Sequence, residues 1–306
     1  MEITGLHKSY GELQAVRGID LQVAEGEVFA LLGPNGAGKT TTVEILEGFR
    51  SRDAGEVRVL GHDPRDNDPA LKARIGVVLQ STGMDPYLTV AETLELFGGY
   101  YPNPRSPEEI MELVGLTEKA DVRVTKLSGG QQRRLDVGVG LAGDPELLFL
   151  DEPTTGFDPG ARRSAWEMIK NLASTGKTIF LTTHFMDEAQ YLADRVAIIA
   201  GGRIIAEGPP ETLAGRDAGS TIIRFKPGGD VALPAPVLAT AREAGDLLEF
   251  TTANPVHFLH ELTAWALDHK GALEGLEGSR PSLEDVYLEL TGAEVADGTD
   301  AEEEGS

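Results

Sequence analysis

Gly33-Pro34-Asn35-Gly36-Ala37-Gly38-Lys39-Thr40 is the stretch that decides the fold class. It follows a short apolar run at residues 27–32, which predicts a buried strand, and it precedes a segment that predicts a helix. A glycine-rich loop in this setting, ending in lysine and threonine, is typical of phosphate-binding loops. Its backbone N–H groups surround phosphates, and the helix N-terminus adds partial positive charge. The loop therefore predicts an α/β domain that binds nucleotide phosphates.

We expect three side chains at the end of this loop to contribute differently to nucleotide and metal binding. We expect Lys39 to reach the β- and γ-phosphates and the Thr40 hydroxyl to bind magnesium. Thr41 should contact the nucleotide without binding the metal. A glycine-rich turn could match the pattern by chance, but its place between strand and helix argues against that explanation.

Short apolar runs recur along the chain and predict further buried strands at residues 75–79, 147–150 and 178–182. Helical segments such as residues 161–172 separate them. This alternation predicts a sheet of parallel strands. Residues 1–24 alternate between apolar and polar side chains in the manner of strands.

Turn and cap residues predict two local structures. Ser106-Pro107-Glu108-Glu109 has the pattern of a capping box, so we expect a helix over residues 107–114. Gly201-Gly202 separates two strand-like runs, at residues 196–200 and 203–206, and predicts a tight hairpin.

The chain changes character near residue 215, which predicts a second, smaller α+β domain over residues 216–292. Residues 216–220 have the composition of a linker. The new domain should contain strands at residues 221–225 and 247–251 and an amphipathic helix at residues 256–269. The last segment, residues 293–306, is acidic without a basic residue, and we expect it to be disordered.

Composition excludes several classes of function. The 306 residues carry a formal net charge of -23, which disfavours nucleic acid or anionic lipid as a direct partner. There is no cysteine, so thiol chemistry is excluded, and the six histidines show no metal-binding spacing. No targeting segment or apolar run of about 18 residues is seen, so we expect a cytoplasmic chain that does not insert into membranes.

Asp151-Glu152 closes the predicted strand at residues 147–150. Parallel strands present their carboxyl ends at one edge, which places both carboxylates beside the phosphate-binding loop. Asp151 should hold magnesium, and Glu152 should orient and deprotonate an attacking water molecule. Two acidic residues at the end of a strand are more often simply exposed to solvent than part of a site. The phosphate-binding loop beside them makes the functional interpretation the better one.

Leu127-Ser128-Gly129-Gly130-Gln131 precedes a further predicted helix, which extends to about residue 141. With this stretch between the loop and the acidic pair, the chain resembles the ATP-binding cassette (ABC) ATPases over residues 1–215. The resemblance implies a P-loop NTPase with a mixed sheet, an antiparallel β subdomain and a helical signature subdomain. It implies that Ser128, Gly130 and Gln131 contact the γ-phosphate of ATP bound to a second copy of the chain, in an ATP-sandwich dimer.

Four further positions resemble family residues one by one. Tyr10 matches the aromatic that stacks on adenine, and Gln80 matches the glutamine that contacts magnesium and links the site to a permease. His184 matches the switch histidine that binds the γ-phosphate. Asp158 matches a loop that crosses between subunits, although it could simply cap the helix that starts at Pro159.

Two stretches resemble the daunorubicin-type drug-export ATPases of the ABC-2 branch: Gly156-Phe157-Asp158-Pro159 and residues 280–287. In the first, Phe157 stands where many family members have leucine. That resemblance implies export of a hydrophobic drug or natural product through a separate integral membrane permease, with the chain at the cytoplasmic face of the cell membrane. Ser282 could instead cap a short helix that merely packs the small domain.

Alternative functions remain open at this point. The cargo could be a lipid, a polysaccharide or an ion, or the chain could be a soluble ABC ATPase without a permease. A regulator that never hydrolyses ATP would be expected to lack Glu152 or His184, and both are present. If a permease exists, we expect residues 81–101 to contact it.

Overall fold

The computed structural model describes residues 1–79, 83–213, 221–228, 240–269, 271–288 and 290. The chain divides into two compact units, Met1–Pro210 and Glu211–Ser306. The expected linker at residues 216–220 and the expected tail at residues 293–306 lie outside the described residues.

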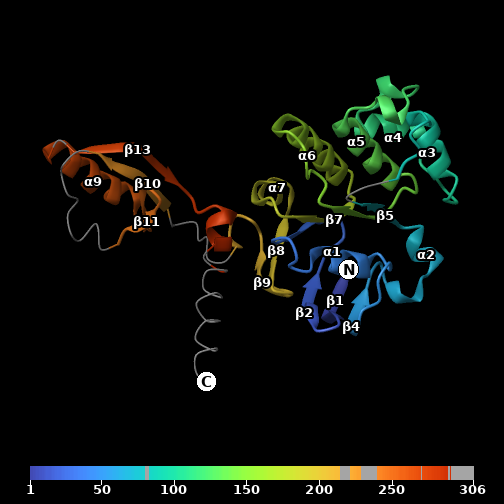
Figure 1. The fold of residues 1–306 in the computed structure, drawn as a ribbon, viewed down its shortest axis with the longest axis horizontal. Helices are drawn as coiled ribbons and strands as arrows, with labels where there is room; N and C mark the ends of the chain where they lie inside the picture. The colour runs from blue at the N-terminus through green and yellow to red at the C-terminus, as the bar shows by residue number, and fades with distance from the viewer. Residues whose placement is uncertain (80–82, 214–220, 229–239, 270, 289, 291–306) are drawn as a thin grey trace. The chain divides into compact units, whose positions relative to one another are not determined.

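A six-stranded sheet forms the centre of the first unit, with strand order β5-β6-β7-β3-β8-β9 (Figure 1). The strands are β3 (Val28–Leu32), β5 (Ile75–Val78), β6 (Leu147–Asp151), β7 (Thr178–Thr183), β8 (Arg195–Ala200) and β9 (Arg203–Gly208). Five run parallel, and β9 returns antiparallel to β8. Every residue of β3, β6 and β7 is buried, as their continuous apolar sequences predict.

A three-stranded antiparallel sheet of order β2-β1-β4 covers part of the same core. Its strands are β1 (Glu2–Tyr10), β2 (Leu13–Gln22) and β4 (Ala54–Arg58), and the last of these was not predicted. Buried Leu6 and Ile19 join Phe29 of the central sheet in one hydrophobic cluster. The mixed central sheet and this antiparallel sheet confirm the fold expected from the resemblance.

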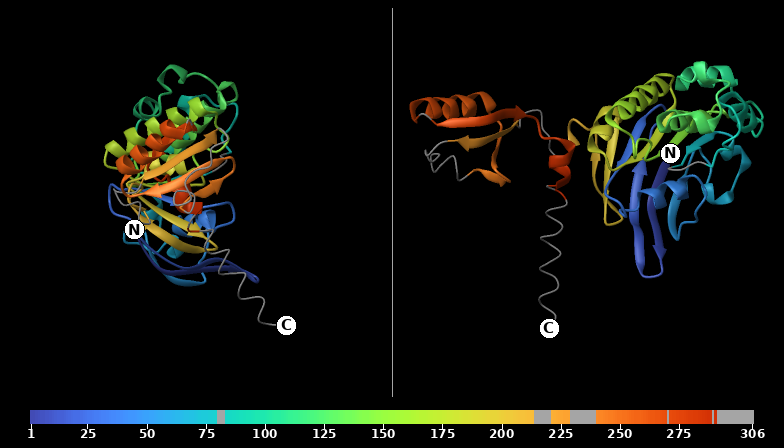
Figure 2. Two further views of the ribbon diagram at one scale, coloured as in Figure 1. Left: turned by 90° about the vertical axis from the view of Figure 1, so that its left-hand side faces the viewer. Right: turned by 45° about the horizontal axis from the view of Figure 1, so that its top comes forward.

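Three helices pack against one another to form a separate layer of this unit (Figures 1 and 2). They are α3 (Val90–Gly98), α4 (Pro107–Val114) and α5 (Gly129–Gly140). Gly138 permits the close approach, because a Cβ there would lie 3.1 Å from Ile110 and 3.3 Å from Leu94. Helix α4 has the predicted bounds, but its cap is simpler than predicted. Ser106 Oγ accepts from the N–H of Glu109, and the exposed Glu109 side chain does not complete the box.

The remaining helices connect the strands. They are α1 (Lys39–Leu46), α2 (Pro69–Lys72), α6 (Pro159–Ser174) and α7 (Met186–Leu192), with short 3-10 turns at Pro64–Asp66, Thr117–Lys119 and Val124–Lys126. Gly201 and Gly202 form the predicted hairpin, with φ angles of 51° and 80° that suit its tight turn. Among the described residues, no helix combines the length and apolar character needed to cross a membrane.

The second unit contains a four-stranded antiparallel sheet of order β11-β12-β10-β13. The strands are β10 (Thr221–Gly228), β11 (Arg242–Ala244), β12 (Leu247–Thr252) and β13 (Ala272–Ser279), and the helix is α9 (Pro255–His269). Phe225 and Phe250 stack with ring centroids 5.5 Å apart, and Leu262 of α9 completes their cluster. The sequence did not predict β13, since its side chains are mostly exposed and it contains two glycines that weaken any strand pattern.

Residues 283–288 are helical, and Asp285 joins them to β10 of the second unit. Leu283 is fully buried and Val286 is 4% exposed. Asp285 accepts hydrogen bonds from the N–H and hydroxyl of Ser282, both at 2.6 Å, and from Arg224 of β10 at 2.6 Å. The packing explanation of this stretch, which the sequence left open, is therefore sufficient for these residues.

Candidate active site

A cavity of about 590 Å³ lies at the carboxyl end of the central sheet. Residues that line it come from the first strands, the glycine-rich loop, the end of β6 and the end of β7: Tyr10, Leu13, Ala15, Asn35, Gly36, Gly38, Lys39, Thr40, Thr41, Glu152, Thr155 and His184. Nine of the predicted site residues are in this list. The fold therefore brings together side chains that are far apart in the sequence.

The glycine-rich loop fits closely against its surroundings. A Cβ on Gly33 would lie 2.3 Å from the carbonyl oxygen of Ile199, and one on Gly38 would lie 2.4 Å from that of Ala15. Gly38 also has a φ of 106°, which strongly favours glycine at the start of α1. Gly33, Pro34 and Ala37 do not line the cavity themselves, and they shape the loop.

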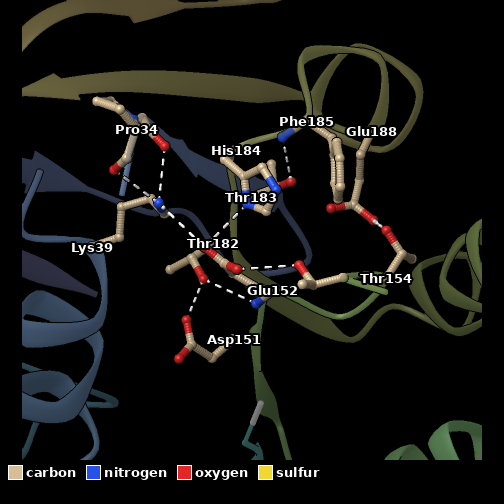
Figure 3. Close-up of polar contacts among 12 residues, drawn as sticks. Pro34, Lys39, Asp151, Glu152, Thr154, Thr182, Thr183, His184, Phe185 and Glu188 are labelled. Atoms are coloured by element: carbon tan, nitrogen blue, oxygen red, sulfur yellow. Dashed lines mark hydrogen bonds and ion pairs between the residues drawn. The ribbon is translucent and has the colours of Figure 1, made fainter. Parts of the chain in front are cut away.

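Lys39 is buried, and its amine donates to the carbonyl oxygens of Gly33 at 2.9 Å and Pro34 at 3.1 Å. The same Nζ atom lies 3.3 Å from Oε1 of Glu152 (Figure 3). These contacts hold the amine at the mouth of the loop. It can exchange one of them for a phosphate oxygen with little movement.

Glu152 is held by three neighbours. His184 Nδ1 lies 3.3 Å from Oε1, the same oxygen that faces Lys39, and the Thr155 hydroxyl donates to Oε2 at 3.1 Å. Burial opposes ionisation, but the hydrogen bond from His184 and the charge of Lys39 outweigh it and lower the pKa of Glu152. The carboxylate is thus ionised at neutral pH.

The backbone of Glu152 is strained, with a φ of 46° in the left-handed region. Such strain persists where the surroundings hold a residue firmly, and it is frequent at active sites. Here the N–H of Glu152 donates to the Thr182 hydroxyl at 3.1 Å and to the Thr182 carbonyl oxygen at 3.1 Å. Thr182 therefore fixes the turn that points Glu152 into the cavity.

Asp151 lies behind Glu152 and is 7% exposed. Its Oδ1 accepts a hydrogen bond from the Thr182 hydroxyl. Burial raises the pKa of Asp151, and the neighbouring charge of Glu152 acts in the same direction. Asp151 is not a lining residue of the cavity.

Three supporting residues were missed by sequence reasoning. Thr155 and Thr182 bond Glu152, and Arg133 of α5 donates to the carbonyl oxygens of Asp151 and Pro153, each at 3.1 Å. A threonine at the end of an otherwise apolar strand was a usable signal for Thr182. No sequence signal linked Arg133 to this edge of the sheet.

Tyr10 lines the cavity and is 39% exposed. The guanidinium carbon of Arg50 lies 5.2 Å from its ring centroid, and Lys8 Nζ lies 5.5 Å from it. Arg50 is in turn paired with Glu44 of α1 at 2.5 Å. The ring is thus supported by cations while remaining open to the cavity.

Ser128, Gly130 and Gln131 are not part of this cavity. Ser128 Oγ accepts from the N–H of Gln131 at 3.3 Å, and Gln131 Oε1 accepts from the N–H of Ser128 at 3.0 Å, which closes a capping box on α5. Asp158 caps α6 by accepting from the N–H groups of Gly160 and Ala161, both at 2.9 Å. Gln80 lies outside the described residues.

Two residues near the loop carry oxygen donors of the kind that bind magnesium. The exposed hydroxyl of Thr40 and the carboxylate of Asp151 supply oxygen ligands, which Mg²⁺ prefers. The part of the chain that the structure describes contains no group of three histidine or acidic side chains able to hold a metal ion.

Comparisons with known proteins agree with this geometry. Residues 16–155 match the family model described as ABC transporter. The chain is 42% identical to the Nod factor export ATP-binding protein I of Paraburkholderia xenovorans (strain LB400), and the alignment covers 97% of this chain and 98% of that protein.

Two solved structures are also similar. The ADP conformation of MJ1267, an ATP-binding cassette of an ABC transporter, has a TM-score of 0.62 at 28% identity and covers 69% of this chain and 92% of that one. The dimeric post-hydrolysis state of the cassette MJ0796, bound to ADP and Pi, has a TM-score of 0.61 at 27% identity, with 68% and 97% covered.

Proposed function

The chain belongs to the ABC transporter family as an ATP-hydrolysing subunit, and we propose that two copies of it energise export through a separate membrane permease. The observation that carries the proposal is the meeting of Lys39, Glu152 and His184 at one carboxylate oxygen in the cavity. The closeness of a carboxylate to two cationic or hydrogen-bonding groups beside the glycine-rich loop supports the proposal that this cavity binds and hydrolyses the terminal phosphate of ATP.

In the proposed reaction, the glycine-rich loop binds the ATP phosphates and Tyr10 stacks on the adenine. Glu152 accepts a proton from a water molecule that attacks the γ-phosphate in line. Lys39 and His184 donate to the oxygens that gain charge. Thr40 and Asp151 hold Mg²⁺, which neutralises phosphate charge when bound.

The site of one subunit is incomplete without a second copy. Ser128, Gly130 and Gln131 lie at the N-terminus of α5, outside the cavity. The exposed N–H groups of a helix N-terminus bind anions. In the proposed dimer, the N-terminus of α5 therefore faces the γ-phosphate of the ATP that is bound to the other subunit. The dimeric cassette MJ0796 supports this arrangement by similarity.

Mixing two inactive variants tests the dimer. Lys39→Ala disables the loop, and Ser128→Asp places a negative charge at the signature. A mixed dimer contains one intact site, formed by the loop of the Ser128→Asp chain and the signature of the Lys39→Ala chain. Hydrolysis restored by mixing supports the proposal, and no restoration at any ratio contradicts it.

The proposed permease contact is a cavity of about 450 Å³ in the first unit. Its lining includes Glu47, Phe49, Phe97 and Tyr101. Phe49 is 70% exposed, and Tyr100, the neighbour of Tyr101 in sequence, is 74% exposed. Exposed aromatic residues are enriched at protein interfaces. Part of the expected segment at residues 81–101 therefore supplies this surface.

Aromatic substitution is a better test of this surface than charge reversal. Glu92 closes a capping box with Thr89, and Asp85 accepts from the N–H of Tyr87, so changes there would alter the local fold. We expect Phe49→Ser and Tyr100→Ser to abolish stimulation of hydrolysis by the permease and to leave unstimulated hydrolysis intact. Val256→Ser, at a position 79% exposed on α9, is the control.

The proposed cargo is a hydrophobic drug or natural product, and the proposed location is the cytoplasmic face of the cell membrane. A second candidate is a Nod factor, since a protein named for its export is 42% identical over nearly the whole chain. The permease that copurifies from native membranes can be reconstituted with this chain in vesicles. ATP hydrolysis stimulated by daunorubicin or by a Nod factor then distinguishes the two.

A further inference from the structure

Glu188 of α7 is a buried carboxyl group that the proposed reaction does not use. Its side chain is fully buried, and burial raises its pKa above the ordinary value. Burying an acidic group is unfavourable unless its hydrogen bonds are satisfied. Its contacts therefore indicate what it does.

Two segments donate to the same oxygen of Glu188. Oε1 accepts from the Thr154 hydroxyl at 2.6 Å and from the Trp166 indole N–H at 3.0 Å (Figure 3 shows the first). Thr154 is fully buried and follows Glu152 by two residues, whereas Trp166 lies in the middle of α6. One carboxyl group thus joins the loop after Glu152 to two helices.

The helix that carries Glu188, α7, begins two residues after His184, with Phe185 as its N-cap. The His184 ring lies against Phe185 with centroids 4.1 Å apart, and the N–H of Phe185 donates to the Thr183 hydroxyl at 2.9 Å. The guanidinium of Arg162, from α6, lies 4.0 Å from the centroid of the Phe185 ring. A displacement of α7 would therefore move the His184 ring.

We propose that Glu188 is a positioning residue that keeps Glu152 and His184 in register across the cavity. Thr154 anchors the segment of Glu152, α7 carries the segment of His184, and Glu188 ties the first to the second. Because both catalytic side chains depend on placement within fractions of an ångström, loss of this tie reduces turnover. The proposal rests on the proposed role of Glu152 as the base.

Removing and restoring the acceptor tests the proposal. Glu188→Ala should lower kcat for ATP by about 100-fold, the cost of a misplacement of about 1 Å, while KM changes by less than about threefold. Glu188→Gln keeps an oxygen that can accept from Thr154 and Trp166, so its kcat should stay within about fivefold of the wild type. A role limited to stability would not produce this split between kcat and KM.

Glu27 provides the matched control. It is also a buried glutamate, with 8% exposure, and its carboxylate accepts from the N–H of Ala24 at 2.7 Å and from Arg195 at 2.9 Å. It lies just before β3, at the opposite edge of the sheet from the cavity. Glu27→Ala should reduce the melting temperature without a comparable loss of kcat.

The proposal is overturned if Glu188→Ala hydrolyses ATP at the wild-type rate or if Glu188→Gln and Glu188→Ala lose kcat equally. It is also overturned if Glu27→Ala lowers kcat as much as Glu188→Ala does. Should Glu188→Ala fail to fold, Thr154→Val and Trp166→Phe each remove one donor and should each lower kcat by about tenfold. Unchanged kcat in both would then overturn it. Rapid ATP hydrolysis by Glu152→Gln would instead contradict the proposed role of Glu152 as the base, and this result does not depend on the Glu188 variants.

Discussion

The amine of Lys39 lies 3.3 Å from Oε1 of Glu152, so the proposed phosphate-binding cation and the proposed base are ion-paired. Both side chains are largely shielded from water, which strengthens the attraction between them. The pair stabilises the ionised form of Glu152. It also means that a phosphate oxygen competes with Glu152 for the same amine.

Replacing Lys39 with alanine should abolish tight ATP binding. The lysine is 4% exposed, and loss of one partner from a buried charged contact costs about 2 kcal/mol or more. We expect the Kd for ATP to rise by at least about 30-fold. Binding of a fluorescent ATP analogue measures it, and Lys8→Ala, beside Tyr10, should show a much smaller change. Equal affinities for Lys39→Ala and wild type would exclude the loop as the phosphate site.

Glu152→Gln should bind ATP but hydrolyse it slowly. The amide cannot accept a proton from water, so kcat should fall by about 100-fold to 10,000-fold. It also removes the negative partner of Lys39, so ATP affinity should be equal or higher. Size-exclusion chromatography with ATP should then show an accumulated dimer. A brisk rate of phosphate release would rule out Glu152 as the base.

Ser128→Asp should separate the two roles of the signature serine. Aspartate is as good an N-cap as serine, so α5 should keep its stability within about 0.5 kcal/mol. The added negative charge repels the γ-phosphate of the partner subunit, and hydrolysis should fall by about 100-fold or more. Thermal unfolding and phosphate release measure the two effects. Ser128→Ala should instead lose stability, by about 1 kcal/mol.

Glu47 should make stability depend on pH. It is 4% exposed, and neither of its carboxyl oxygens has a hydrogen-bond partner among the residues that the structure describes. Burial, with the charges of Asp151 and Glu44, raises the pKa of Glu47 to about 8 from 4.5. The folded protein therefore keeps a proton that the unfolded chain releases, and stability falls as pH rises between these values.

The variant Glu47→Gln removes this proton linkage. Its free energy of unfolding should exceed that of the wild type by a margin that grows with pH, by at most about 1.4 kcal/mol per pH unit up to pH 8. Urea unfolding at pH 6, 7 and 8 measures the margin. Glu95→Gln, at an exposed position of α3, should show no such trend. A constant margin for Glu47→Gln would mean that the carboxyl is ionised throughout.

Leu283→Ala should destabilise the second unit. The side chain is fully buried, and such truncations cost about 2 to 5 kcal/mol. Hydrogen exchange in residues 283–288 and in β10, which Arg224 joins to Asp285, should accelerate, while exchange in the central sheet stays unchanged. Leu288→Ala, in the same helix but 53% exposed, should have an effect of about 0.5 kcal/mol or less. Equal effects of the two variants would contradict the packing described for this helix.

Much of the site could be predicted from sequence because its signals are local. The loop at residues 33–40 must combine glycine, lysine and threonine at fixed spacing to surround a phosphate, and continuous apolar runs identified β3, β6 and β7. Strand β13 escaped prediction, since its pairing with β10 depends on backbone hydrogen bonds and not on a pattern of buried side chains. The reciprocal cap expected at Glu109 was wrong for a similar reason: an exposed side chain is free to remain in water.

The sequence by itself determined the α/β class, and it identified the glycine-rich loop, Lys39, Glu152 and His184 as candidate site residues. Only the tertiary structure decided that Lys39 and His184 meet at one oxygen of Glu152, and that Glu188 joins the loop after Glu152 to two helices. Spacing along a chain reports which groups can form a turn or a cap. Contacts between distant strands and helices depend on how the sheet is ordered and packed, and no local pattern of residues encodes them.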